Sequence, residues 1–403
     1  MHIPPAKTHK RASVLIASIA ICLCIGTAYT FSIFAQPLAE LFGWSLSQVM
    51  LAFSICAGIS PLPMIIGGKL LDAGWGKGAI IGGGMLFATC LFLTGFINRL
   101  WLLYLLYGIG GGMGLSISYS GLVNNSIKLY ADKRGIAGGL ITAAYGASAV
   151  LMAPVANLLI QNCGVMAAFR ILGLFYLLVT GIAAIFITDA SKFQPPQMPK
   201  PQTPNLPLAT NLHWRQMLKT TRFYLLILIF ISGTMAGLML VSNTAVMGQT
   251  MFGLTATTAA LFVSIYALCN CGGRFIFGML SDRLGHYQTI ILICLLISIV
   301  LLQAAIIHNL FSFLLTLIGV GLGFGGIMGI FPSLTSALFG LKYCGVNYGV
   351  VFIGYSLGAL IGPKIAAAVA TATGGDFTPA FLIAMGFSLA GMVFTMLLKK
   401  STT

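Results

Sequence analysis

Long apolar stretches separated by short polar breaks repeat along the whole chain. Each stretch holds about 20 apolar residues, and an α-helix of that length crosses the hydrocarbon core of a bilayer. The pattern therefore predicts an all-α membrane protein with twelve transmembrane helices. Their approximate positions are residues 13–35, 46–67, 79–97, 100–126, 136–160, 165–187, 223–247, 255–279, 288–307, 311–337, 346–371 and 379–398.

Composition and charge agree with a membrane location. Hydrophobic residues make up 58% of the 403 positions and only 7% carry charge, against about 25% in soluble domains. The net charge of +15 would indicate nucleic acid in a soluble protein. Here, if the N-terminus is cytoplasmic, the outer breaks hold only Arg99 among the basic residues, as the positive-inside rule requires. We therefore expect a multi-pass protein of the cell's inner (plasma) membrane with both termini cytoplasmic, and no nucleic-acid partner.

A proline-rich segment divides the predicted helices six and six. Residues 189–221 contain six prolines together with Lys, Gln and Asn, a composition that favours an extended cytoplasmic linker. The expected domains are a six-helix bundle in residues 1–188 and a second in residues 222–403.

The two halves also share residues at one constant offset of 210 positions. This agreement indicates an internal repeat, and therefore two six-helix pseudo-repeat bundles. Parallel repeats of this kind place a substrate site near the membrane midplane, between halves that rock about it. The matching pairs are Gly68 and Gly278, Leu70 and Leu280, Asp72 and Asp282, Ser126 and Ser336, Gly135 and Gly345, and Tyr145 and Tyr355.

The repeated segments 68–76 and 278–285 resemble the G-x-L-x-D-R-x-G loop of the major facilitator superfamily. The second copy fits fully, whereas the first has Ala73 in place of Arg and one extra residue before its last glycine. The resemblance implies the major facilitator fold. It also implies a gating role for Asp72, Asp282 and Arg283, in which the carboxylate pairs with neighbouring helix ends in one state. The alternative is that each Asp is an ordinary residue at the membrane interface. The presence of the motif in both halves makes this alternative less favoured.

A closer resemblance, to the oxalate/formate antiporter family, runs along most of the chain. It implies transport of small carboxylates such as oxalate, formate, lactate or pyruvate. The segments that carry it are residues 26–29 (GTAY), 132–135 (DKRG), 143–146 (AAYG), 270–274 (NCGGR), 281–282 (SD), 331–333 (FPS) and 347–349 (NYG).

One arginine is predicted to lie at membrane depth. Arg274 precedes Asp282 by eight residues, roughly 12 Å along a helix. Its planar fork could bind a carboxylate, or its side chain could snorkel to the cytoplasmic surface. The spacing alone does not decide between carboxylate binding and snorkelling. The resemblance favours carboxylate binding, because the matching arginine of the family binds substrate. All six acidic residues map to breaks or helix ends, which leaves no carboxylate for a buried proton relay; they are Glu40, Asp72, Asp132, Asp189, Asp282 and Asp376.

Two positions near Arg274 bear on the charge of the substrate. Asn270 lies one turn before Arg274 on the same helix face. The resemblance places an Asp at this spacing in monocarboxylate transporters, and an Asn cannot carry a proton. Tyr355 stands where the oxalate carriers use a lysine. One arginine balances one negative charge, which favours a monocarboxylate. Lys364 could supply a second cation, although an outer-end snorkelling position is favoured.

Aromatic and amide side chains complete the predicted shell. Tyr29, Tyr119 and Tyr145 match tyrosines that line the central pocket in the family. Phe324 and Met328 stand where the oxalate carriers have aromatic residues, and the flexible Met suggests room for a methyl-bearing substrate. Asn243 is a weaker candidate ligand. For each tyrosine, packing is the alternative to ligation.

Together these features predict a secondary active transporter of small monocarboxylates, of the lactate, pyruvate or formate type, that works by alternating access. Coupled proton entry and anion exchange are both open, and we expect a monomer. An oxalate/formate antiporter and a non-transporting membrane sensor with a carrier fold are the alternatives. No enzyme activity, metal or cofactor is expected, because the predicted helices contain no acid/base pair, metal cluster or nucleophile with a base.

Overall fold

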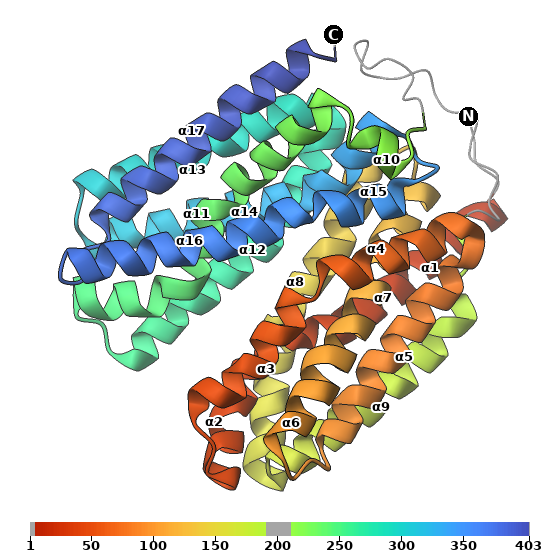
Figure 1. The fold of residues 1–403 in the computed structure, drawn as a ribbon, viewed down its shortest axis with the longest axis horizontal. Coiled ribbons are helices and arrows are strands. Elements are labelled where there is room, and N and C mark those ends of the chain that lie inside the picture. Colours follow the sequence, from red (N-terminus) through yellow and green to blue (C-terminus); the bar gives the residue numbers. More distant parts are fainter. Residues whose placement is uncertain (1–4, 191–210, 403) are drawn as a thin grey trace. The chain divides into compact units, whose positions relative to one another are not determined.

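The computed structural model describes residues 5–190 and 211–402, and in those residues every regular element is helical (Figure 1). Eleven apolar helical stretches in the described residues are long enough to cross a membrane. The longest, Leu46–Thr94, has 49 residues and would measure about 74 Å as one helix, more than twice the core of a bilayer. It is interrupted at Gly74, where a positive φ of 86° breaks the helix. The stretch is therefore two spans, and the predicted all-α fold with twelve helices is confirmed.

The chain forms two units that do not coincide fully with its two halves. Among the described residues, the first unit comprises residues 5–131, 144–190 and 342–350, and the second comprises residues 132–143, 211–341 and 351–402. The start of each half's fifth helix thus belongs to the unit built by the other half. The boundaries predicted from the linker did not anticipate this exchange, because linker composition carries no information on helix packing.

Close backbone contacts hold the first unit together, in which α5 lies beside both α7 and α9 (Figure 1). A Cβ on Gly83 would lie 2.7 Å from the Gly114 carbonyl oxygen, so only glycine allows α5 and α7 to approach this closely. This unit contains α1 (Pro5–Ile25), η1 (Gly26–Thr30), α2 (Phe31–Phe42), α3 (Leu46–Gly58), α4 (Pro61–Leu70), η2 (Leu71–Trp75), α5 (Gly76–Thr94), α6 (Leu100–Leu103), η3 (Tyr104–Gly111), α7 (Gly112–Leu129), most of α8 (Arg134–Cys163), α9 (Val165–Phe186) and most of α15 (Cys344–Val351).

The second unit is built around α14, most of whose residues are buried and which lies along α12 and α13 (Figure 1). Glycines again remove the side chains at the contact: Gly325 lies against the Asn270 carbonyl and Gly329 against the Arg274 carbonyl. This unit contains the first turns of α8 together with α10 (Trp214–Met217), α11 (Thr221–Phe252), α12 (Ala256–Leu284), α13 (His286–Ile306), α14 (Leu310–Phe339), α16 (Ile353–Ala372) and α17 (Thr378–Lys400).

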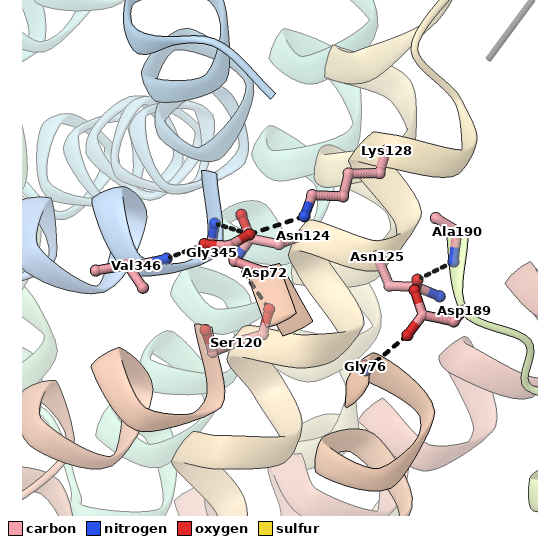
Figure 2. Close-up of polar contacts among 10 residues, drawn as sticks. All are labelled: Asp72, Gly76, Ser120, Asn124, Asn125, Lys128, Asp189, Ala190, Gly345 and Val346. Carbon is pink, nitrogen blue, oxygen red and sulfur yellow. Dashed lines mark hydrogen bonds and ion pairs between the residues drawn. The ribbon is translucent and has the colours of Figure 1, made fainter. Parts of the chain in front are cut away.

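Both ends of the predicted linker are anchored, whereas its residues 191–210, which include all six prolines, lie outside the described residues. At one end the Gly76 amide donates to Asp189 Oδ2 over 2.7 Å (Figure 2). At the other end the Leu212 amide donates to the Phe339 carbonyl over 3.0 Å, just before the short helix α10. The described ends are therefore folded against the bundles, which composition alone did not predict.

Candidate functional site

Arg274 lies at the packing surface between α12, α14 and the first turns of α8. Its side chain is 3% exposed, and it donates from Nε to Asn270 Oδ1 (3.1 Å) and from Nη1 to the Thr142 carbonyl (2.8 Å). Asn270 is one turn farther from Asp282 than Arg274 is, so the guanidinium is directed away from that end of α12. This geometry does not fit snorkelling toward the Asp282 end of the helix.

Asn270 contributes a second donor group beside the guanidinium. It is 7% exposed, and its Nδ2 has no hydrogen-bond partner within the described residues. A buried donor without a partner costs about 1–3 kcal/mol. An anion bound at Arg274 could accept from this amide, which makes Asn270 a candidate ligand as well as a support for Arg274.

The other predicted ligands of the second unit lie in three different surroundings. Phe324 and Met328 are buried on α14, each one residue before a glycine that contacts α12. Tyr355 on α16 is half-buried, with its ring centroid 4.7 Å from that of Phe352. Asn243 donates from Nδ2 to the Met239 carbonyl and to Ser242 Oγ, so its amide donors are used within α11. Asn243 is thus the least suited of these residues to hold a ligand.

The three predicted tyrosines come together in the first unit. The Tyr145 ring lies 5.2 Å from Tyr29 in an edge-on arrangement and 4.8 Å from Tyr119, between centroids. Tyr29 is 41% exposed and belongs to the 3₁₀ turn η1, whereas the other two rings are buried. Three residues that are far apart in the sequence therefore form one aromatic cluster.

Asp72 holds the first turn of α15 (Figure 2). Its carboxylate accepts from the Val346 amide over 3.0 Å and from the Gly345 amide over 3.3 Å, and it pairs with Lys128 Nζ at 2.7 Å. The side chain of Asp72 is only 6% exposed. The sequence did not predict this burial, because α15 and α7 cover a position that the sequence places in a break between helices.

Asp282 makes the same contact in the second unit. Its two oxygens accept from the Gly135 and Ile136 amides, each over 2.8 Å, at the first turn of α8. Each of the three positions lies 210 residues from its counterpart in the first contact, Asp282 after Asp72, and Gly135 and Ile136 before Gly345 and Val346. The two halves thus share a contact as well as residue identities: in each, an Asp carboxylate accepts from the first amides of a helix. Negative charge is stabilised at a helix N-terminus.

The two copies differ in their cations. Lys128 has Leu338 at the equivalent position of the second half, so the lysine is not repeated, and the cation that acts on Asp282 is Arg134. Asp282 is exposed, and Arg283 beside it is exposed without a polar partner among residues 5–190 and 211–402. Lys128 was not singled out from the sequence, although comparing the halves would have revealed a charged residue whose repeat partner is apolar.

Replacing Lys128 with Met should destabilise the protein by about 3 kcal/mol, because it leaves the Asp72 carboxylate buried without its cation. Leu338→Met is the matched control at the repeat-equivalent position, and this apolar exchange should cost less than about 1.5 kcal/mol. Thermal unfolding of the detergent-purified proteins measures both. Equal shifts for the two variants would show that the ion pair contributes nothing.

Lys364 is exposed on α16. It follows Tyr355 by nine residues, which places it about 180° around the helix from that side chain. It therefore does not replace the family lysine on the Tyr355 face. Within the described residues, no three His, Cys, Asp or Glu side chains are placed to hold a metal ion.

A buried arginine, an aromatic cluster and two carboxylates on helix N-termini thus occur in a twelve-span, two-repeat helical protein. The sequence model of the Major Facilitator Superfamily matches residues 16–363. The chain belongs to the major facilitator superfamily. It is accordingly a multi-pass membrane transporter, and the resemblance of its repeated loop to that superfamily is confirmed.

Comparison with individual members of the superfamily supports both resemblances. The oxalate:formate antiporter of Oxalobacter formigenes is 30% identical over 388 residues, which cover 94% of this chain and 90% of that protein. Monocarboxylate transporter 12 of Xenopus laevis is 28% identical and covers 93% of this chain and 84% of that protein. The crystal structure of the major facilitator transporter FucP superimposes with a TM-score of 0.72 at 14% identity, over 96% of this chain and 98% of that one, which shows the shared fold.

Proposed function

We propose that this transporter is a secondary carrier of small monocarboxylates that works by alternating access, with Arg274 as the anion ligand. The observation that carries the proposal is a guanidinium that is 3% exposed within a membrane span. The oxygens of Asn270 and Thr142 that accept from it are neutral, so neither cancels its charge. A charged group at membrane depth is costly to keep and marks substrate pathways.

The site favours a single negative charge. One guanidinium can bind one carboxylate through two parallel hydrogen bonds, and the Asn270 amide adds a third donor. Tyr355, at the position of the family lysine, offers a hydroxyl and no charge. A second carboxylate would thus be desolvated without a cation here, which disfavours dianions.

The tyrosine cluster and the two carboxylate contacts have proposed roles as well. Within the first unit, Tyr29, Tyr119 and Tyr145 would offer hydroxyls to the substrate while their rings exclude water. Asp72 and Asp282 would act as gates that hold α15 and α8 in one state and release them in the other. The distribution of Lys and Arg supports a plasma-membrane orientation with both termini in the cytoplasm.

Exchange of oxalate for formate is the second candidate, and the 30% identical oxalate:formate antiporter favours it. Purified protein in liposomes should take up labelled lactate, pyruvate or formate, and unlabelled monocarboxylates should compete more strongly than oxalate. Stronger competition by oxalate would select the antiporter instead. Binding of a carboxylate without any uptake would indicate a sensor with a carrier fold.

Lys364→Gln should leave monocarboxylate uptake within about twofold of the unsubstituted protein, because the lysine lies on the opposite side of α16 from Tyr355. Initial rates in the same liposomes measure this. If the variant lost most of its transport, Lys364 would be a ligand, and the argument from charge balance for a monocarboxylate would fail.

A further inference from the structure

The first turns of α8 and the second half of α12 are joined by a row of contacts that includes the proposed substrate ligand. At one end of the row, Asp282 accepts from the first amides of α8. At the other end, Arg274 donates to the Thr142 carbonyl and Cys271 Sγ donates to the Ala143 carbonyl over 3.3 Å. All of these residues lie in the second unit.

Glycines bring the two backbones together between these ends. A Cβ on Gly139 would lie 2.5 Å from the Arg274 carbonyl oxygen, and a Cβ on Gly278 would lie 2.6 Å from the Gly135 carbonyl oxygen. Neither position can hold a larger residue without moving a helix. This approach brings the Thr142 carbonyl within 2.8 Å of the guanidinium.

A carboxylate that binds the guanidinium through two hydrogen bonds must compete with either the Thr142 carbonyl or the Asn270 oxygen. A bidentate carboxylate uses either the Nη1 and Nη2 edge or the Nε and Nη2 edge. Thr142 occupies Nη1 and Asn270 occupies Nε, so each edge already holds at least one acceptor.

Thr142 is the acceptor that can be displaced at lower cost. A carbonyl inside an α-helix also accepts from the amide four residues later, so the Thr142 oxygen keeps a partner after Arg274 leaves. If Asn270 stays on Nε, its Nδ2, which has no partner within the described residues, remains beside the anion as a further donor.

We infer that the Thr142 carbonyl is an internal competitor of the substrate carboxylate for Arg274, so that anion binding releases the first turns of α8 from α12. The inference rests on the proposed function of Arg274 as the anion ligand. It links occupancy of the site to the contact that Asp282 holds, because displacement removes the hydrogen bond between the Arg274 guanidinium and α8, while the Asp282 contact at the other end of the row stays in place.

Gly139→Ala tests the competition directly, because the added methyl group presses on the Arg274 backbone carbonyl and pushes α8 away from α12 while both ligand side chains, Arg274 and Asn270, keep their identity. With its competitor removed, Arg274 should bind lactate, pyruvate or formate at least about threefold more tightly than in the unsubstituted protein. Gly272→Ala is the matched control: it lies on α12 with nothing within 4 Å of the added Cβ, and its affinity should not change. Unchanged or weaker binding by a folded Gly139→Ala protein would overturn the inference.

Hydrogen exchange of the unsubstituted protein decides the case if Gly139→Ala does not fold. Saturating anion should raise amide exchange in residues 134–143, and a folded Gly139→Ala protein should show the raised exchange without anion. Binding of an anion with no change in exchange would refute the competition and leave the proposed function standing. Failure of all three anions to bind would instead refute the proposed function, and the inference with it.

Discussion

Replacing Arg274 with Ala should abolish monocarboxylate uptake in liposomes, with a loss of at least about 100-fold. The variant loses two charge-assisted hydrogen bonds to the substrate, each worth about 1.5–3 kcal/mol, together with the only charge proposed to bind the anion. Arg274→Lys should retain measurable uptake, because it keeps the charge but loses the planar fork that orients a carboxylate.

Arg170 provides the matched control for this experiment. It is also an arginine of a membrane-spanning helix, but it is half-buried on α9 and lies 5.1 Å from the centre of the Phe96 ring. Arg170→Gln should retain uptake. Full transport by a folded Arg274→Ala protein would rule out Arg274 as the anion ligand, and equal loss in both variants would show a general requirement for membrane arginines.

Asn270→Asp should make transport depend steeply on protons. The aspartate carboxylate would replace the amide oxygen that now lies 3.1 Å from Arg274 Nε, where it would neutralise the guanidinium and compete with the substrate. Uptake near pH 7.5 should fall about tenfold or more, since an added ionic hydrogen bond of about 1.5–3 kcal/mol must be broken. Lowering the pH protonates the new carboxyl group, frees Arg274 and should restore uptake.

The control for this prediction is Asn270→Ser, which keeps the position neutral. It should lower uptake through the loss of a donor without adding a new dependence on pH. Initial rates of labelled lactate uptake between pH 5.5 and 8 separate the two variants. If Asn270→Asp had the same pH profile as Asn270→Ser, the side chain at 270 would not control the charge available to the substrate.

The sequence alone determined the membrane architecture, because an apolar stretch of about 20 residues can satisfy its backbone in a bilayer only as a helix. It also determined the repeat, since matched residues at a fixed offset need no structure to be seen. Arg274, Asn270 and the three tyrosines were found from residue types at positions that match a family, and the structure groups the first two in one unit and the tyrosines in the other.

Only the tertiary structure decided what these residues touch. Asp72 and Asp282 hold helix ends 274 and 146 positions away, Lys128 completes only one of the two contacts, and Thr142 acts through its carbonyl. Backbone amides and carbonyls are the same at every residue, so the sequence does not reveal which of them will meet a side chain. Close approach of helices at glycines selects them, and that selection is a property of packing in three dimensions.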